Sequence, residues 1–135
     1  MRNFILVLIL AFGFFFVSYV FVGDVSTRTV RFLRHAGWEP NGILESEKII
    51  LPDFTDAANM AYNDLQKSCG YDLAPYAGKT VSRITCRVFN RPDDPQIVYA
   101  HVFWYKGRII GGDIMTPGLT GFMYGLQKRS PSMQM

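Results

Sequence analysis

The strongest constraint on this chain is an uninterrupted apolar run near its start. The stretch from Phe4 to Val22 includes no charged side chain and no proline. A helix of this length covers about 28 Å, close to the hydrocarbon thickness of a bilayer. A cleaved signal peptide needs small residues before its cut site, but Phe16 and Phe21 stand at position −3 of the nearest candidate sites. The run therefore favours an uncleaved signal anchor, a transmembrane segment over residues 1–23.

The charges on either side of this run leave its orientation open. Arg2 precedes it and several arginines follow it, which under the positive-inside rule favours a cytoplasmic domain. A basic residue ahead of an apolar run is instead typical of export signals, and whole domains translocate largely regardless of charge. We expect a single-pass protein of the cell membrane with its domain outside the cytoplasm.

The sequence after the anchor has the composition of one globular domain. Residues 24–127 are rich in aromatic side chains and contain no internal repeat, and we expect residues 128–135 to form a flexible tail. The net charge of +3 is slight, and no recognition motif or long basic run occurs. We therefore expect the membrane rather than a nucleic acid as the partner of the basic residues.

Cysteine and histidine are too few and too scattered to indicate a metal or cofactor. Cys69 and Cys86 allow either two buried thiols or one disulfide in an oxidising compartment. His35 and His101 do not lie at ligand spacing from each other or from the cysteines. No nucleophile elbow occurs either, so we expect no metal and no cofactor.

Hydrophobic periodicity predicts an α+β domain. The expected elements, in order, are a helix over 26–36 capped by Ser26 or Thr27, an edge strand over 43–51, a main helix over 54–69, strands over 80–90, 96–105 and 108–115, and a short closing helix over 119–126. Together they predict an N-terminal transmembrane helix followed by one antiparallel sheet that is packed on its inner face by the main helix.

Alternation and helical spacing predict which side chains are buried. On the main helix the expected apolar stripe is Phe54, Ala57, Ala58, Ala61, Leu65 and Cys69. On the central strand the residues expected to face that helix are Val98, Ala100, Val102 and Trp104. The opposite face of this strand is then open to solvent.

Several segments taken together resemble a known family. They are FLRHAGWE at 32–39, LPDF at 51–54, YNDLQKSCGYDLAPYAGKTV at 62–81, and WYKGRIIGGDI followed by GFMYGL at 104–126. The pattern resembles small Gram-positive bacterial proteins, membrane-anchored or lipoproteins, that are catalogued only as a domain of unknown function. Tyr71 and Tyr124 stand where the resemblance leads us to expect phenylalanine and histidine. The resemblance implies no activity.

Two places in the domain are candidate binding sites. An open sheet face carrying Tyr99, His101, Phe103 and Tyr105 would suit a protein, peptide or glycan partner, and a second helix over that face would remove the hypothesis. The pair Gly111-Gly112 would let the backbone approach a ligand that Asp113 could hold. The alternative, which we favour, is a β-bulge with Asp113 capping the following turn.

The leading hypothesis is a single-pass membrane protein of the bacterial cell envelope that displays a small, non-catalytic interaction module at the membrane surface. One alternative is a small envelope enzyme with Asp113 and His101 in its site. Another is a juxtamembrane regulator that senses anionic lipid headgroups through Arg28, Arg31 and Arg34.

Overall fold

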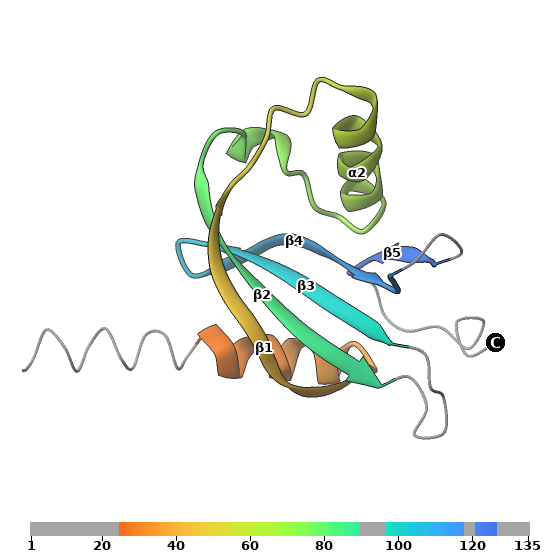
Figure 1. The fold of residues 1–135 in the computed structure, drawn as a ribbon. Coiled ribbons are helices and arrows are strands. Elements are labelled where there is room, and N and C mark those ends of the chain that lie inside the picture. Colours follow the sequence, from red (N-terminus) through yellow and green to blue (C-terminus); the bar gives the residue numbers. More distant parts are fainter. Residues whose placement is uncertain (1–24, 90–96, 118–120, 127–135) are drawn as a thin grey trace, which may run out of the picture.

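A computed structural model describes residues 25–89, 97–117 and 121–126 (Figure 1). These residues form a five-stranded antiparallel sheet in which every strand pairs with its neighbours in sequence, so its order is β1-β2-β3-β4-β5. The strands are β1 (Glu39–Ile50), β2 (Thr80–Phe89), β3 (Val98–Tyr105), β4 (Arg108–Met115) and β5 (Met123–Gly125). A helix over residues 25–35 precedes them, and α2 (Ala57–Ser68) and the short η1 (Ala74–Tyr76) join β1 to β2. The predicted α+β class is confirmed.

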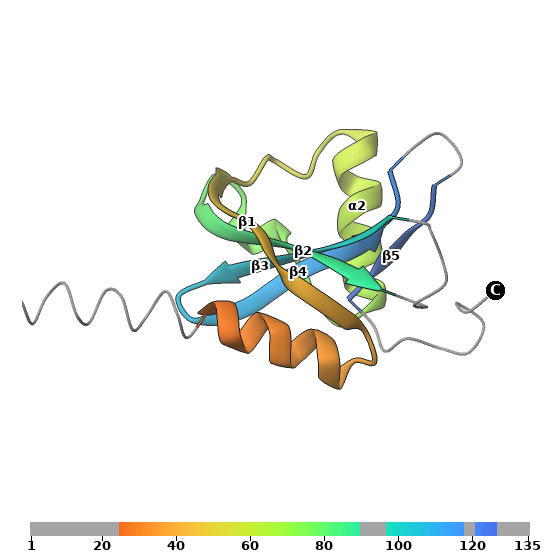
Figure 2. The same cartoon turned by 60° about the horizontal axis from the view of Figure 1, so that its bottom comes forward.

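The sheet lies between two helices, one on each face (Figure 2). This corrects the prediction of a single main helix on one inner face. The residues expected to face the main helix instead share a core cluster with Leu33 of the helix over 25–35; they are Val98, Ala100, Val102 and Trp104. The sequence expectation failed because the first helix carries enough apolar surface to bury one whole face of the sheet.

A buried hydrogen bond holds the first helix on the sheet. Thr29 is fully buried, and its Oγ1 accepts a hydrogen bond of 2.8 Å from the indole Nε1 of Trp104. The same hydroxyl donates to the backbone carbonyl one turn earlier, at 2.9 Å. Ser26 and Thr27 lie inside the helix, so the prediction that either caps it is wrong. Gly37, with a φ of 93°, follows the helix as expected.

The face of α2 that packs on the sheet differs from the predicted apolar stripe. The alanines of that stripe are exposed, whereas Asn63 and Gln66 are buried. Both amide oxygens are hydrogen-bonded there: Asn63 Oδ1 accepts from the backbone N–H of Leu73 at 2.7 Å, and Gln66 Oε1 accepts from that of Gly112 at 2.8 Å. Nε2 of Gln66 is buried and bonds to no described residue. A pattern based on apolar residues alone missed these positions because hydrogen bonding lets polar groups be buried.

The helix α2 also begins later than predicted. Asp56 is its N-cap and accepts a hydrogen bond of 2.9 Å from the backbone N–H of Asn59. The helix therefore starts at Ala57 rather than at Phe54, because a capping carboxylate fixes the first turn.

Strand pairing confirms some local predictions and corrects others. β1 lies at an edge of the sheet, as its mixed faces indicated. Lys106 and Gly107, with φ of 48° and 76°, form the two-residue hairpin expected between β3 and β4. The predicted closing helix over 119–126 is wrong, because residues 123–125 form strand β5 instead; residues 118–120 lie outside the described residues.

A bulge interrupts the pairing of β3 with β4. Trp104 pairs with Ile109 and Phe103 pairs with Gly111, so Ile110 is an extra residue on β4. The bulge expected near Gly111-Gly112 is therefore confirmed. It sets which β4 residues face α2 in the rest of the strand.

Three predictions concern the ends and the thiols. The expected anchor over 1–23 and the tail over 128–135 lie outside the described residues. Within the described ranges, none of the helices has the length and apolar character that a bilayer crossing requires. Cys69 and Cys86 are not joined by a disulfide.

Candidate functional site

A pocket of about 290 Å³ opens between α2, the segment after β1 and the α2 side of the sheet. Its apolar walls are Ile49, Leu51, Phe54, Phe103, Met115 and Met123. Tyr62, Arg83, His101 and Asp113 supply polar groups to the same pocket. Apolar walls with a few convergent polar groups are typical of a ligand site.

A buried carboxylate organises the polar side of this pocket. Asp113 is only 4% exposed. One of its oxygens, Oδ2, accepts a hydrogen bond of 2.5 Å from the hydroxyl of Tyr62, and Oδ1 lies 2.8 Å from Nδ1 of His101. We call Tyr62, His101 and Asp113 the carboxylate cluster. It joins α2, β3 and β4.

The bonding of the carboxylate cluster fixes which ring nitrogen of His101 carries a proton. A carboxylate only accepts hydrogen bonds, so both the hydroxyl of Tyr62 and Nδ1 of His101 donate to Asp113. Burial, followed by the negative charge of Asp113, raises the pKa of Tyr62 far above its ordinary value, so its hydroxyl stays protonated. No described residue bonds to the other ring nitrogen, Nε2, which is therefore the atom of the cluster left for a ligand.

Glycines allow α2 to approach the sheet closely enough to form this cluster. A Cβ at Gly111 would lie 2.7 Å from Oε1 of Gln66, and one at Gly112 would lie 2.0 Å from the carbonyl oxygen of His101. The two glycines thus serve the packing of α2 on β4 and the pairing of β3 with β4. Asp113 points into the cluster and does not cap the following turn, so that prediction was wrong.

Arg83 adds a positive charge beside the cluster. It projects from β2, opposite Phe103, and forms an ion pair with Glu47 on β1. Its Nε is buried and bonds to no described residue. A ligand group that accepts hydrogen bonds would satisfy this buried donor.

The family match covers most of the sequence that builds this site. The family described as "Domain of unknown function (DUF4830)" matches residues 32–114. The chain belongs to this family. The matched range of the DUF4830 domain includes all three residues of the carboxylate cluster, and it confirms the resemblance to a domain of unknown function. No curated protein and no solved structure matches the chain.

The structure of the DUF4830 domain brings together three of the five predicted binding residues. His101, Phe103 and Asp113 line one pocket, whereas Tyr99 and Tyr105 do not. The expectation of an open aromatic sheet face is wrong, because α2 lies over that face (Figure 2) and Phe103 is buried in the core cluster against which Tyr62 of α2 packs. Tyr105 packs edge-on against another tyrosine ring, with ring centres 5.3 Å apart.

Sequence reasoning missed two members of the site. Tyr62 was absent from the predicted helix stripe, although its half-buried ring packs edge-on against Phe103, with 6.5 Å between the ring centres. Arg83 was not among the predicted binding residues. Strand alternation could have signalled Arg83, because it falls on the same sheet face as Phe103 and His101.

The structure divides the three arginines expected at the membrane surface. The guanidinium of Arg28 donates a hydrogen bond of 3.0 Å to the carbonyl of Gly107 and lies 4.8 Å from the ring centre of Trp104. Arg31 and Arg34 are exposed and border a separate groove. Arg28 is also exposed, but it helps to hold the first helix on the sheet, whereas Arg31 and Arg34 bond to no described residue.

The side chains of the DUF4830 pocket support binding and proton transfer. Tyrosine, histidine, asparagine, arginine and aspartate supply its polar groups, and no serine, threonine, cysteine or lysine is among the described residues that line it. Within the described ranges, no group of three or more metal-ligating residues occurs. The chemistry that this geometry offers is a hydrogen bond to a ligand, or a general base at Nε2 of His101.

Proposed function

We propose that this chain is a single-pass membrane protein whose domain is a small, non-catalytic binding module displayed outside the cytoplasm. The support for the tether is the apolar run from Phe4 to Val22, which has the length of a bilayer crossing and lacks a good cleavage site. The binding surface is the pocket beside α2, in place of the open aromatic face first expected.

One observation carries the binding proposal. The carboxylate cluster holds His101 in a fixed orientation, with Nε2 as its remaining polar atom, at the edge of an apolar pocket. Burying the carboxylate of Asp113 costs desolvation free energy, which its two hydrogen bonds offset. These bonds hold Nε2 of His101 in a fixed position, and a fixed polar atom in an apolar pocket can orient a ligand.

The pocket walls indicate the chemistry of the ligand. Phe54, Met115 and Met123 suit an apolar or aromatic body, and methionines adapt to varied shapes. His101 and the buried Nε of Arg83 suit a single polar group, such as a carboxylate or amide, at one end of that body. We propose a peptide side chain with its backbone amide, or a small molecule of the same character, rather than a glycan.

Methyl NMR tests this proposal directly. The full chain would be labelled at the methionine methyl groups and mixed, in neutral detergent micelles, with a library of small aromatic carboxylates and amides. Compounds that enter the pocket should shift the signals of Met115 and Met123 but leave that of Met60, which is 51% exposed on α2 and does not line the pocket.

A matched pair of variants then tests the role of the cluster. Replacing His101 with glutamine should weaken the binding of these compounds about tenfold or more, because Nε2 no longer occupies its fixed place. The control is Tyr99→Phe, on the same strand face but outside the pocket. Compounds that shift only Met60, or bind equally well to the His101 variant, would contradict the proposal.

The tether needs a separate measurement. Protease added to intact cells should degrade the domain and leave a fragment that contains the apolar run. A domain that is protected in intact cells and cut only after lysis would place the module on the cytoplasmic side. A domain released into the medium without residues 1–23 would refute the anchor.

A second candidate function is a small envelope enzyme. The observation that favours it is the bond between Asp113 and Nδ1 of His101, because a carboxylate in that position stabilises a protonated ring during base catalysis. Ligands found by NMR would be incubated for hours with the chain and followed for new signals. Product signals that disappear in the His101→Gln variant would establish the enzyme, and unchanged ligand would support the binding module.

A further inference from the structure

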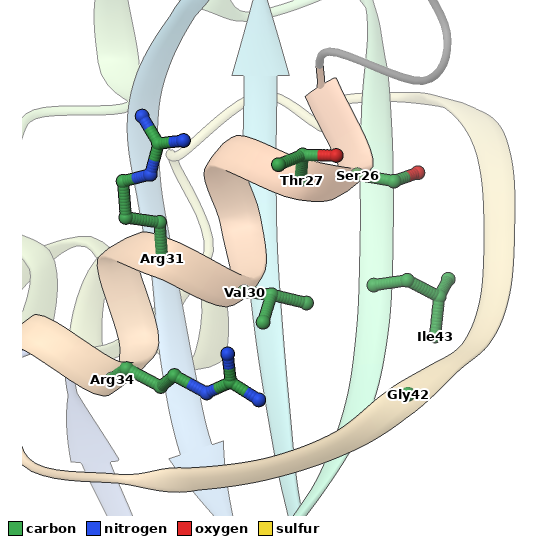
Figure 3. A pocket seen from close by; sticks show the side chains of 7 residues that line it. All are labelled: Ser26, Thr27, Val30, Arg31, Arg34, Gly42 and Ile43. Atoms are coloured by element: carbon green, nitrogen blue, oxygen red, sulfur yellow. The ribbon is translucent and has the colours of Figure 1, made fainter.

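A second cavity lies on the opposite side of the domain, between the first helix and β1. This groove has a volume of about 440 Å³ (Figure 3). Val30 and Ile43 provide its apolar lining, Arg31 and Arg34 border it, and Ser26 and Thr27 lie at the end where the helix begins. The carboxylate cluster takes no part in it.

The local backbone of β1 leaves this groove open. Regular pairing of β1 with β2 is interrupted on both sides of Ile43, between Pro40 and Ile43 and between Ile43 and Glu45. Gly42, with a φ of 73°, turns the strand there, and a Cβ at that position would meet nothing within 4 Å. The helix cannot close the gap by shifting, because Thr29 bonds it to the sheet on its other side.

The two arginines that border the groove, Arg31 and Arg34, are not paired with an acidic side chain among the described residues. They are three residues apart, about one helical turn. In Figure 3 the side chain of Arg34 extends from the helix toward Gly42 of β1, whereas that of Arg31, one turn earlier, extends away from Gly42 and Ile43. Both are exposed, neither bonds to a described residue, and no acidic side chain is among the described residues that line the groove.

We propose that this groove binds the phosphate of an anionic lipid headgroup, with Arg34 and Arg31 as its cationic partners. Guanidinium groups bind phosphate oxygens in pairs of parallel hydrogen bonds. The hydroxyls of Ser26 and Thr27 can add further donors, and the apolar lining suits the glycerol portion of the lipid rather than a bare phosphate ion.

The position of the groove along the chain favours a lipid over a soluble anion. Ser26 follows the last residue of the apolar run, Val22, by so few residues that even a fully extended chain would span about 14 Å between them. If the run crosses a bilayer, the helix end of the groove lies within reach of the headgroup layer. This step rests on the proposed membrane tether, whereas binding in the groove itself does not require it.

Side-chain NMR of the full chain in neutral detergent micelles tests the proposal. Phosphatidylglycerol would be added at increasing mole fraction while the Nε–Hε signals of the arginines are recorded, with phosphatidylcholine as the neutral comparison. The signals of Arg31 and Arg34 should shift with phosphatidylglycerol and saturate, and that of Arg28 should move least, because it already bonds to Gly107. A separate series would use inorganic phosphate in micelles without anionic lipid.

Charge-matched variants separate a site from general attraction. The double variant Arg31→Gln with Arg34→Gln should weaken the interaction with phosphatidylglycerol about tenfold to thirtyfold. The control, Lys67→Gln with Lys106→Gln, removes the same charge from exposed positions elsewhere and should leave it unchanged.

Each result bears on the proposal. Saturating shifts that only the arginine variant weakens would support it. Equal weakening in both double variants, or no saturating shift, would overturn it. Binding of inorganic phosphate as tight as that of the lipid would replace the lipid with a soluble phosphate. Because micelles do not require a bilayer crossing, failure of the tether and failure of the groove would be seen separately.

Discussion

The hydroxyl of Tyr62 offers the cleanest test of the carboxylate cluster. Tyr62→Phe removes one hydrogen bond of 2.5 Å to a buried carboxylate and leaves the ring contact with Phe103 in place. A hydrogen bond to a charged group contributes about 1.5–3 kcal/mol, and Asp113 would keep its bond to His101. We therefore expect a loss of about 2 kcal/mol in the free energy of unfolding, or a fall in Tm of roughly 8–16 °C for a domain of this size.

Thermal unfolding of the full chain in neutral micelles would measure this loss. Trp38 and Trp104 are both buried, so tryptophan fluorescence reports the transition. The matched control is Tyr76→Phe, which deletes the same atom from a tyrosine whose hydroxyl bonds to no described residue, and we expect a change within about 0.5 kcal/mol. Equal effects of the two substitutions would refute the bonding assigned to Tyr62.

The pH dependence of the same variant gives a second check. The pKa of Tyr62 is raised in the folded state, so its contribution to stability is fully present below the ordinary tyrosine pKa of about 10 and declines as the pH rises above that value. The difference between the native chain and Tyr62→Phe should therefore shrink above about pH 10. A difference that grows with pH would show that the phenol ionises more readily in the folded domain.

Three further predictions concern packing and burial. Gly112→Ala should destabilise the domain by about 3 kcal/mol, because the new Cβ would lie 2.0 Å from the carbonyl oxygen of His101 on β3. Gly78→Ala has nothing within 4 Å of its new Cβ, so it should cost only the roughly 1 kcal/mol of placing alanine in a left-handed backbone conformation. Thermal unfolding compares the two variants. Burial raises the pKa of Cys86 from 9.0 to about 11, so stability should decline as the pH rises through this range, and Cys86→Ala should remove that part of the decline in a pH series of Tm. Thr29→Val should leave the buried indole N–H of Trp104 without its acceptor and cost about 1–3 kcal/mol, with a change in tryptophan emission.

Local signals in the sequence predicted most of the strands and turns. The hairpin at Lys106-Gly107, the bulge before Gly111 and the stop after the first helix all follow from residues with special backbone preferences. Alternation along β3 also separated its two faces correctly, with Trp104 on one and His101 on the other. Such features depend on a few neighbouring residues, which is why a single sequence reveals them.

The arrangement of the helices was not predictable by the same means. Periodicity shows that an element has an apolar side but not which surface it covers. The main helix α2 was therefore assigned to the wrong face of the sheet, and the helix over 25–35 was not assigned to a particular face. On α2 the buried positions include Asn63 and Gln66, whose partners lie in a connection and in β4. Partners far away in sequence leave no mark on a helical wheel, so Tyr62 was missed as well.

The bulge at Ile110 connects the fold to the candidate site. If the same sequence paired without a bulge, the register of Trp104 with Ile109 would continue and place Asp113 opposite Ala100. Side chains of paired residues share a face, so the carboxylate would then enter the apolar cluster beneath the first helix, where no charge is compensated. With the bulge, Asp113 pairs with His101 and faces Tyr62. The bulged register thus places on the pocket side, where it orients His101, a carboxylate that would destabilise the core in the regular register.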